Sequence, residues 1–222
     1  MRRVTRKKLK QDEFVSIVDQ VIQWFSENWR PVAAAAAGAV AVFLLWWGLS
    51  AWSGHRKEAA SQALASSLEQ LDKAATAEAR EDAESALREV IDRYGRTPQA
   101  DEARVILARL LVDDGKVDEA RKLLTKVAQK RKDSPTVRVA TLDLIGIQVA
   151  SGQAAEVIPQ LEAMVTGKDP RLPRDVALYE LAEVNITEGN HDKAREYLQK
   201  LMEDFPESPY AGQARQKLQE LG

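Results

Sequence analysis

The chain has 222 residues, of which 45% are hydrophobic and 30% charged, and its 32 Lys and Arg nearly balance its 34 Asp and Glu. It contains no Cys and two His, so a disulfide framework, a cysteine zinc site and a thiol nucleophile are excluded, and a histidine metal site or a Ser-His-Asp triad has little room. The sequence carries no phosphate-binding glycine loop, no G-x-S-x-G elbow and no H-E-x-x-H motif. We therefore expect a protein that is not an enzyme, with no catalytic residues, no metal and no other cofactor.

Charge divides the chain into three segments. Residues 1–31 carry seven basic and four acidic side chains, a net +3, whereas residues 58–222 carry 23 basic and 30 acidic side chains, a net −7. Between them, residues 32–52 contain no charge, and as a helix they would be about 31 Å long, close to the roughly 30 Å of a bilayer core. All five Trp flank this stretch or lie near its ends. We expect residues 32–53 to be a transmembrane helix; the alternative is a buried Ala-rich helix of a soluble protein.

The basic residues before this span predict its direction. By the positive-inside rule the N-terminus is cytoplasmic and residues 54–222 are extracytoplasmic, which in a Gram-negative bacterium means an inner-membrane protein with a periplasmic domain. Within the basic tail, residues 1–31, apolar side chains at helical spacing predict an amphipathic helix on the inner leaflet, so that residues 14–52 contact lipid. These side chains are Phe14, Val18, Val21, Ile22, Phe25 and Trp29. The acidic remainder argues against nucleic acid as a partner.

A repeat of about 37 residues runs through the C-terminal segment. Three glycines, Gly115, Gly152 and Gly189, are 37 residues apart, and four prolines recur at nearly the same interval, Pro98, Pro135, Pro173 and Pro209. A hydroxyl residue before Pro predicts an N-cap and the first turn of a helix, as at Thr97, Ser134 and Ser208. Each Gly predicts a turn with positive φ after that helix. Such self-similarity predicts an array of helix pairs.

The expected fold is all-α: the amphipathic helix, the single transmembrane helix, then an α-solenoid of about four helix pairs with a closing helix. The pairs are expected at residues 55–95, 98–131, 135–166 and 173–205, and the closing helix at 209–221. The first helix of the array can also simply continue the membrane helix past Gly54. Pro159 is expected to kink or delay the second helix of the third pair.

Repeat arrays of this kind bind through a concave groove lined by their first helices. Helical register predicts the groove residues Val105, Arg109, Val112, Asp113, Leu142, Gly146, Val149, Tyr179, Glu183 and Ile186. The alternative is that the next repeat or the closing helix covers some of them. Further along, Glu180, Glu183, Glu188, His191 and Asp192 can be drawn as an acid/base or metal cluster, but carboxylates at i, i+3 spacing on a solvated helix face explain them better.

The repeat residues resemble those of tetratricopeptide repeats. Small residues occupy the position of close helix approach in the first helices, at Ala108 and Ala182, and in the second helices, at Ala86, Ala120 and Ala194. The segments 94–98 and 205–209 resemble the turn between repeats, each opening on an aromatic residue. The Trp usual in the first helix is missing and the period is three residues longer than usual, so the repeats are divergent.

The plan of the whole chain resembles the YfgM-like ancillary subunits of the SecYEG translocon, including the basic opening segment at residues 3–14. This resemblance implies a membrane-anchored protein-binding module that helps pass secreted proteins to periplasmic chaperones, with the SecYEG translocon, the chaperones or unfolded secretory clients as partners. The alternative is a structural scaffold that binds one folded partner in an envelope assembly, such as outer-membrane insertion, cell-wall or division machinery. A homo-oligomer is a third use, since Gly38 and the neighbouring Ala run favour close packing of span helices.

Overall fold

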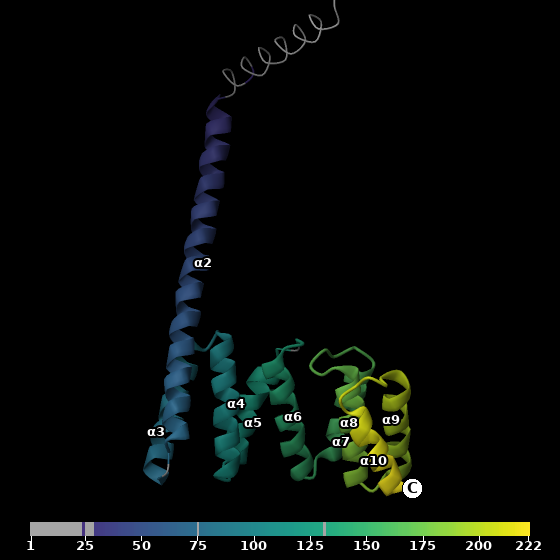
Figure 1. Ribbon diagram of the computed structural model, residues 1–222. Coiled ribbons are helices and arrows are strands. Elements are labelled where there is room, and N and C mark those ends of the chain that lie inside the picture. The colour runs from purple at the N-terminus through teal and green to yellow at the C-terminus, as the bar shows by residue number, and fades with distance from the viewer. Residues whose placement is uncertain (1–23, 25–28, 75, 131) are drawn as a thin grey trace, which may run out of the picture. The chain divides into compact units, whose positions relative to one another are not determined.

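The computed structural model describes residues 24, 29–74, 76–130 and 132–222. The predicted amphipathic helix and basic tail lie outside these residues, apart from Trp24 and the residues from Trp29 onward. The described part consists of helices and turns without a strand, which confirms the all-α prediction (Figure 1). By its internal contacts the chain divides into two units, Met1–His55 and Arg56–Gly222, which are considered separately.

The described part of the first unit is dominated by the N-terminal portion of helix α2, Trp29–Asp72. Its large apolar side chains between Val40 and Trp52 are more than half exposed wherever they are described. Among the described residues, one helical segment, Ala37–Asp72, is long and apolar enough to cross a membrane by length and composition, and its most apolar stretch is not buried. Helix α2 continues through Gly54, one of the two arrangements expected for the start of the array.

The second unit is an array of antiparallel helices that pack in chain order (Figure 1). The C-terminal part of α2 pairs with α3, α4 with α5, α6 with α7 and α8 with α9, and α10 closes the array. Their bounds are α3 Ala77–Tyr94, α4 Pro98–Asp113, α5 Val117–Ala128, α6 Pro135–Ala150, α7 Ala154–Val165, α8 Arg174–Thr187, α9 His191–Asp204 and α10 Ala211–Leu221. The predicted pairs and closing helix agree with these bounds to within a few residues.

Hydroxyl caps begin two of the first helices as predicted. The Thr97 Oγ1 atom accepts a hydrogen bond from the backbone N–H of Ala100 at 3.3 Å, and the Ser134 Oγ atom accepts one from Val137 at 3.3 Å. The same prediction for Ser208 is wrong, because helix α10 begins later, at Ala211, with Tyr210 at its cap. The Ser208 hydroxyl accepts a hydrogen bond from the backbone N–H of Tyr210 at 3.2 Å and donates one to Asp175 Oδ2 at 2.7 Å, so it belongs to the turn before the helix.

The turns inside the last three pairs use the three glycines spaced by 37 residues. Gly115, Gly152 and Gly189 have φ of 76°, 75° and 75°. An L side chain rarely adopts this conformation, which explains the recurrence of Gly at these turns. The sequence prediction of positive φ is confirmed at all three positions.

Pro159 does not delay the second helix of the third pair; the kink, the other effect expected of it, stays a prediction. Helix α7 begins at Ala154 and continues through Pro159 to Val165. A proline ring there removes one N–H donor, which would otherwise bond the carbonyl of Ala155. Because Ala155 is exposed, water can bond that carbonyl instead, so the helix tolerates the proline.

The core consists of three apolar clusters arranged along the array. The first joins α2 to α6, the second joins α6 to α9, and the third joins α8, α9 and α10. The largest fully buried side chains are mainly leucines, contributed by first and second helices alike: Leu87, Leu107, Leu111, Leu124, Leu161, Leu178, Leu181, Leu198 and Leu201. Helix α6 contributes to two clusters, so it links the two halves of the array.

Candidate protein-binding groove

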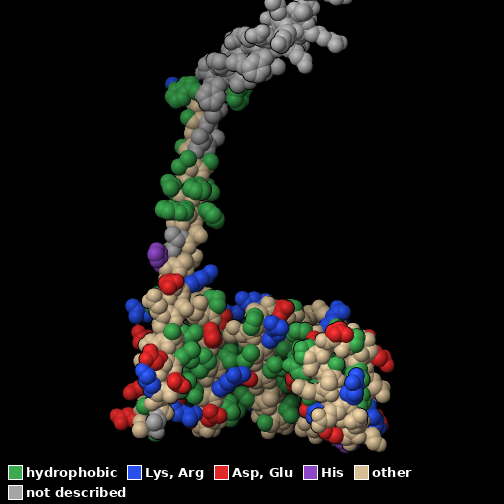
Figure 2. Space-filling model, in the orientation of Figure 1, with side chains coloured by type: hydrophobic (Ala, Val, Ile, Leu, Met, Phe, Trp, Pro, Cys, Tyr) green, Lys and Arg blue, Asp and Glu red, His purple; other side chains and the backbone are tan. Residues whose placement is uncertain are grey.

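A hollow of about 380 Å³ lies between the first helices α4 and α6. Half of the predicted groove residues line it, namely Arg109, Val112, Asp113, Leu142 and Gly146. Buried side chains of the core form its floor, contributed by Ala108, Leu124 and Ile147. Figure 2 shows hydrophobic side chains reaching the surface among charged ones on the visible face of the second unit.

The repeat itself explains why these residues meet. Helices α4 and α6 are one 37-residue step apart, so side chains of α4 face the side chains of α6 that lie about one repeat later in the chain. Arg109 bridges the two helices with a two-pronged ion pair: its Nε lies 2.7 Å from Asp143 Oδ2 and its Nη2 lies 3.1 Å from Oδ1. This bond raises the pKa of Arg109, so the guanidinium stays charged. The hollow is thus apolar within and charged at its border.

The predicted groove residues outside this hollow have other environments. Val105 is buried in the first core cluster, so it is not available to a ligand, which corrects the assignment from helical register. Val149 is partly buried against the second cluster. In register, position 105 points between the helices because α4 packs against both α5 and α6.

The closing helix covers the predicted residues of the fourth pair. The rings of Tyr179 and Tyr210 are 4.9 Å apart, and Glu183 Oε1 lies 2.9 Å from Lys217 Nζ of α10. Ile186 packs against the third core cluster. The concave face of the fourth pair is therefore occupied by the chain's own closing segment, the alternative that the sequence left open.

Several residues of the hollow were not found from the sequence. Asp143, Ala150 and the floor residues line it without having been singled out. Asp143 follows Arg109 by 34 residues, which is about one repeat. Opposite charges at this spacing could have indicated an ion pair between neighbouring first helices. The floor residues are apolar like the rest of the core, so the sequence did not distinguish them from other core residues.

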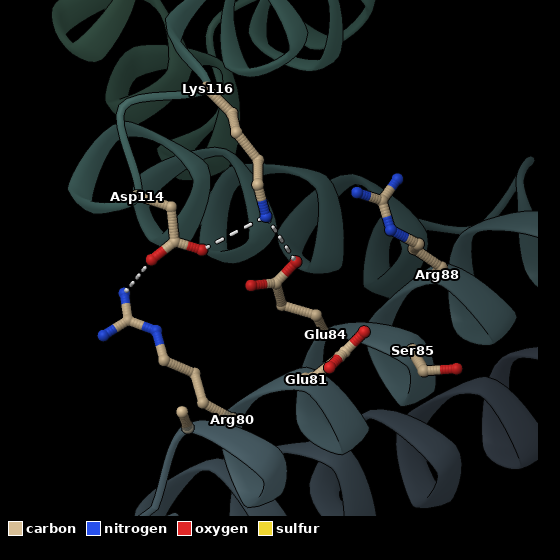
Figure 3. Close-up of a pocket in the computed structure, with 8 residues that line it drawn as sticks. Arg80, Glu81, Glu84, Ser85, Arg88, Asp114 and Lys116 are labelled. Atoms are coloured by element: carbon tan, nitrogen blue, oxygen red, sulfur yellow. Dashed lines mark hydrogen bonds and ion pairs between the residues drawn. The ribbon is translucent and has the colours of Figure 1, made fainter.

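A second hollow, of about 530 Å³, lies between α3 and the turn from α4 to α5, and it is ionic (Figure 3). Asp114 accepts ion pairs from Arg80 at 3.3 Å and from Lys116 at 3.4 Å. Lys116 Nζ also lies 3.9 Å from Glu84 Oε2. Beside these residues, Arg88 Nη1 lies 2.6 Å from Glu119 Oε1. These contacts tie α3 to the following pair.

The charges in this second hollow neutralise one another. Burial raises the pKa of Glu84, and its hydrogen bond with Asp114 raises it further. The same hydrogen bond lowers the pKa of Asp114, and Arg80 and Lys116 add to the lowering. Positive and negative side chains alternate around the hollow, so we assign it a role in joining repeats. In the part of the chain that the structure describes, three or more His, Asp or Glu side chains do not gather as a group that could hold a metal ion.

Two family models agree with this architecture. A family model described as a tetratricopeptide repeat-like domain matches residues 22–169, and a tetratricopeptide repeat model matches residues 148–218. Two crystal structures from Podosopora anserina, described as a kinesin light chain with nearly identical TPR-like repeats, are 21% identical over 67% of this chain and 86% of theirs, with TM-scores of 0.44 and 0.45. No curated protein matches the chain. Because one family model spans well over half of the sequence, the chain belongs to the tetratricopeptide repeat-like domain family.

Proposed function

We propose that this chain is a membrane-anchored protein-binding module that holds polypeptide segments in the hollow between α4 and α6. One observation carries the proposal: an apolar hollow of about 380 Å³ opens between two first helices of a tetratricopeptide-like array. First helices line the peptide-binding face of such arrays. The family supports protein partners in general, and the hollow supplies a place for them.

The chemistry of the hollow suits weak and broad binding. Burying one aliphatic side chain contributes about 1.5–3 kcal/mol, before the cost of ordering the segment is subtracted. Val112 at the rim is 39% exposed and needs no rearrangement to meet a ligand. A module with one such contact would take many extended chains and release them quickly.

The proposed anchor is the apolar part of α2. The uncharged run at 32–52 and the exposure of its large apolar side chains support insertion into lipid, since water would otherwise contact that whole stretch. The basic tail supports a cytoplasmic N-terminus and an extracytoplasmic repeat unit. A reporter enzyme fused after Gly222 tests this: we expect activity only for a periplasmic reporter, and activity only for a cytoplasmic one would contradict the topology.

We further propose that the module lies beside the Sec translocon of an inner membrane. The resemblance in plan to YfgM-like subunits supports this place, and weak binding suits a protein that hands secreted chains to periplasmic chaperones. A scaffold for one folded envelope partner differs from it in a measurable way, because a scaffold has one dominant partner.

Photo-crosslinking in living membranes separates these outcomes. A photoreactive amino acid replaces Val112 at the rim of the hollow, and a matched one replaces Glu203, which is exposed on α9 in the other helix layer. We expect adducts with translocon subunits and many secretory proteins from position 112 alone. One dominant folded adduct would favour the scaffold, and equal adducts from both positions would refute binding in the hollow.

A further inference from the structure

Ion pairs on the first-helix face follow a 34-residue spacing. Arg109 of α4 pairs with Asp143 of α6, 34 residues later, at 2.7 and 3.1 Å. Glu183 of α8 pairs with Lys217 of α10, also 34 residues later, at 2.9 Å. Because Arg109 and Glu183 are two 37-residue repeats apart, the two pairs occupy equivalent positions in the array.

Between them lies a third equivalent position that has an acidic residue but no cation. One repeat after Arg109 and Asp143 come Gly146 and Glu180. Gly146 has no side chain to offer, and a Cβ atom placed on it would meet nothing within 4 Å. Among the described residues, Glu180 has no hydrogen bond or ion pair, unlike both of its counterparts in the array.

The Glu180 carboxylate is also poorly solvated. It is partly buried, and burial raises its pKa, with the nearby Glu183 raising it further. Glu183 is itself neutralised by Lys217, so the uncompensated charge is that of Glu180. A half-buried carboxylate that has no partner in the chain gains from a cation that arrives with a ligand.

We propose that a bound polypeptide completes this position by placing a Lys or Arg side chain against Glu180 while a neighbouring aliphatic side chain enters the hollow between α4 and α6. The inference rests on the proposed function and names the class of segment that the groove selects. Glu180 is on α8 and the hollow lies between α4 and α6, so different residues of one segment make the two contacts. We take a spacing of three residues, about 10 Å in an extended chain, for the test.

Charge complementarity favours such a segment over other occupants. A divalent metal requires several oxygen ligands, and among the described residues Glu180 belongs to no group of three or more His, Asp or Glu side chains that could hold one. The phosphates of lipid headgroups are anionic, so Glu180 repels them. An acidic peptide meets the same repulsion.

Fluorescence anisotropy on the full-length chain in detergent micelles tests the inference. The probes are labelled ten-residue peptides of an Ala–Gly host with one Leu and, three residues before or after it, Arg, Gln or Glu. We expect one of the two Arg peptides to bind about tenfold more tightly than its Gln counterpart, and the Glu peptide to bind most weakly.

Four variants locate the effect. Glu180→Gln should remove the preference for Arg, and Gly146→Arg should remove it too by supplying the cation internally. Glu196→Gln and Glu203→Gln, at exposed positions of α9, serve as matched controls and should keep the preference. Thermal melting followed by circular dichroism verifies that each variant is folded.

The outcomes distinguish this inference from the function on which it rests. An Arg preference that survives Glu180→Gln overturns the inference. So does equal binding of Arg, Gln and Glu peptides that is lost in Val112→Glu, but that result leaves the proposed function standing. Absence of binding for every peptide, or binding unaffected by Val112→Glu, overturns both.

Discussion

The two hollows of the repeat unit differ in whether the side chains that line them find partners within the chain. In the ionic hollow, Arg80, Lys116 and Arg88 meet Asp114, Glu84 and Glu119, so its charges are compensated within the chain. In the hollow between α4 and α6, apolar side chains face open space. The first therefore serves the array, and the second is left for something outside it.

The same contrast appears along the row of 34-residue pairs. Its first and last members are ion pairs within the chain, and its middle member, Gly146 with Glu180, is not. Compensated positions join repeats, whereas the uncompensated one includes Gly146, which lines the apolar hollow.

The largest effect is expected in the floor of the apolar hollow. Leu124 is 1% exposed and belongs to the first core cluster. Leu124→Ala should lower the free energy of unfolding by about 2–5 kcal/mol, because it loses buried surface and leaves a cavity. Urea denaturation of the full-length chain in detergent measures this. Lys122→Ala, at an exposed neighbour on α5, is the control, and an equal loss there would contradict the assignment of the floor.

Filling the middle position of the row should stabilise the array. Gly146→Ala should raise the free energy of unfolding by about 0.5–1 kcal/mol, because alanine favours the helix more than glycine does. Gly146→Arg should gain more at low salt, since it also places a cation beside Glu180. Thermal melts at low and high salt measure the difference. A salt-independent difference would mean that the arginine does not reach Glu180.

The pH dependence of stability reports on the uncompensated carboxylate. Burial and Glu183 raise the pKa of Glu180 in the folded chain, so its contribution to stability is fully present below its unfolded pKa and is lost as the pH rises through its folded pKa. Glu180→Gln should therefore be at least as stable as the natural chain at pH 7, and the natural chain should gain relative to it as the pH falls toward 4. A parallel pair of stability curves would contradict the burial of an unpaired charge.

The smallest effect is expected at the border of the apolar hollow. Arg109 is mostly exposed, so Arg109→Met should change the free energy of unfolding by no more than about 1 kcal/mol even though it removes a two-pronged ion pair. Arg88→Met in the ionic hollow, where both partners are also partly exposed, should cost a similarly small amount. Parallel urea titrations compare them. A loss of several kcal/mol in either variant would make that pair a principal support of the array.

The sequence predicted the helix pairs because local chemistry determines their ends. Helix ends depend on residues only a few positions away, so they can be predicted from the local sequence. The examples are the caps at Thr97 and Ser134 and the glycines at 115, 152 and 189. The prediction was wrong at Ser208, whose hydroxyl bonds both to Tyr210 in the turn before α10 and to Asp175, a distant partner that the local sequence does not indicate.

The candidate site was predictable in part, for the same reason. Helical register placed Arg109, Val112 and Leu142 on the face that forms the hollow. It could not show that α10 covers Tyr179 and Glu183, since that depends on how the closing helix packs. Nor did it separate Glu180 from an ordinary solvated carboxylate, because the missing partner is recognised only by comparison with the equivalent ion pairs.

A polarity-sensitive fluorophore at the rim of the hollow reports directly on whether a peptide binds between α4 and α6. The chain has no Cys, so Val112→Cys gives a single labelling site, and Glu203→Cys on α9 gives the matched control. The full-length chain in detergent is titrated with an unlabelled Leu-bearing peptide from the Ala–Gly host. We expect a saturable blue shift at position 112 and none at position 203; no shift at position 112, or equal shifts at both, would contradict binding in the hollow between α4 and α6.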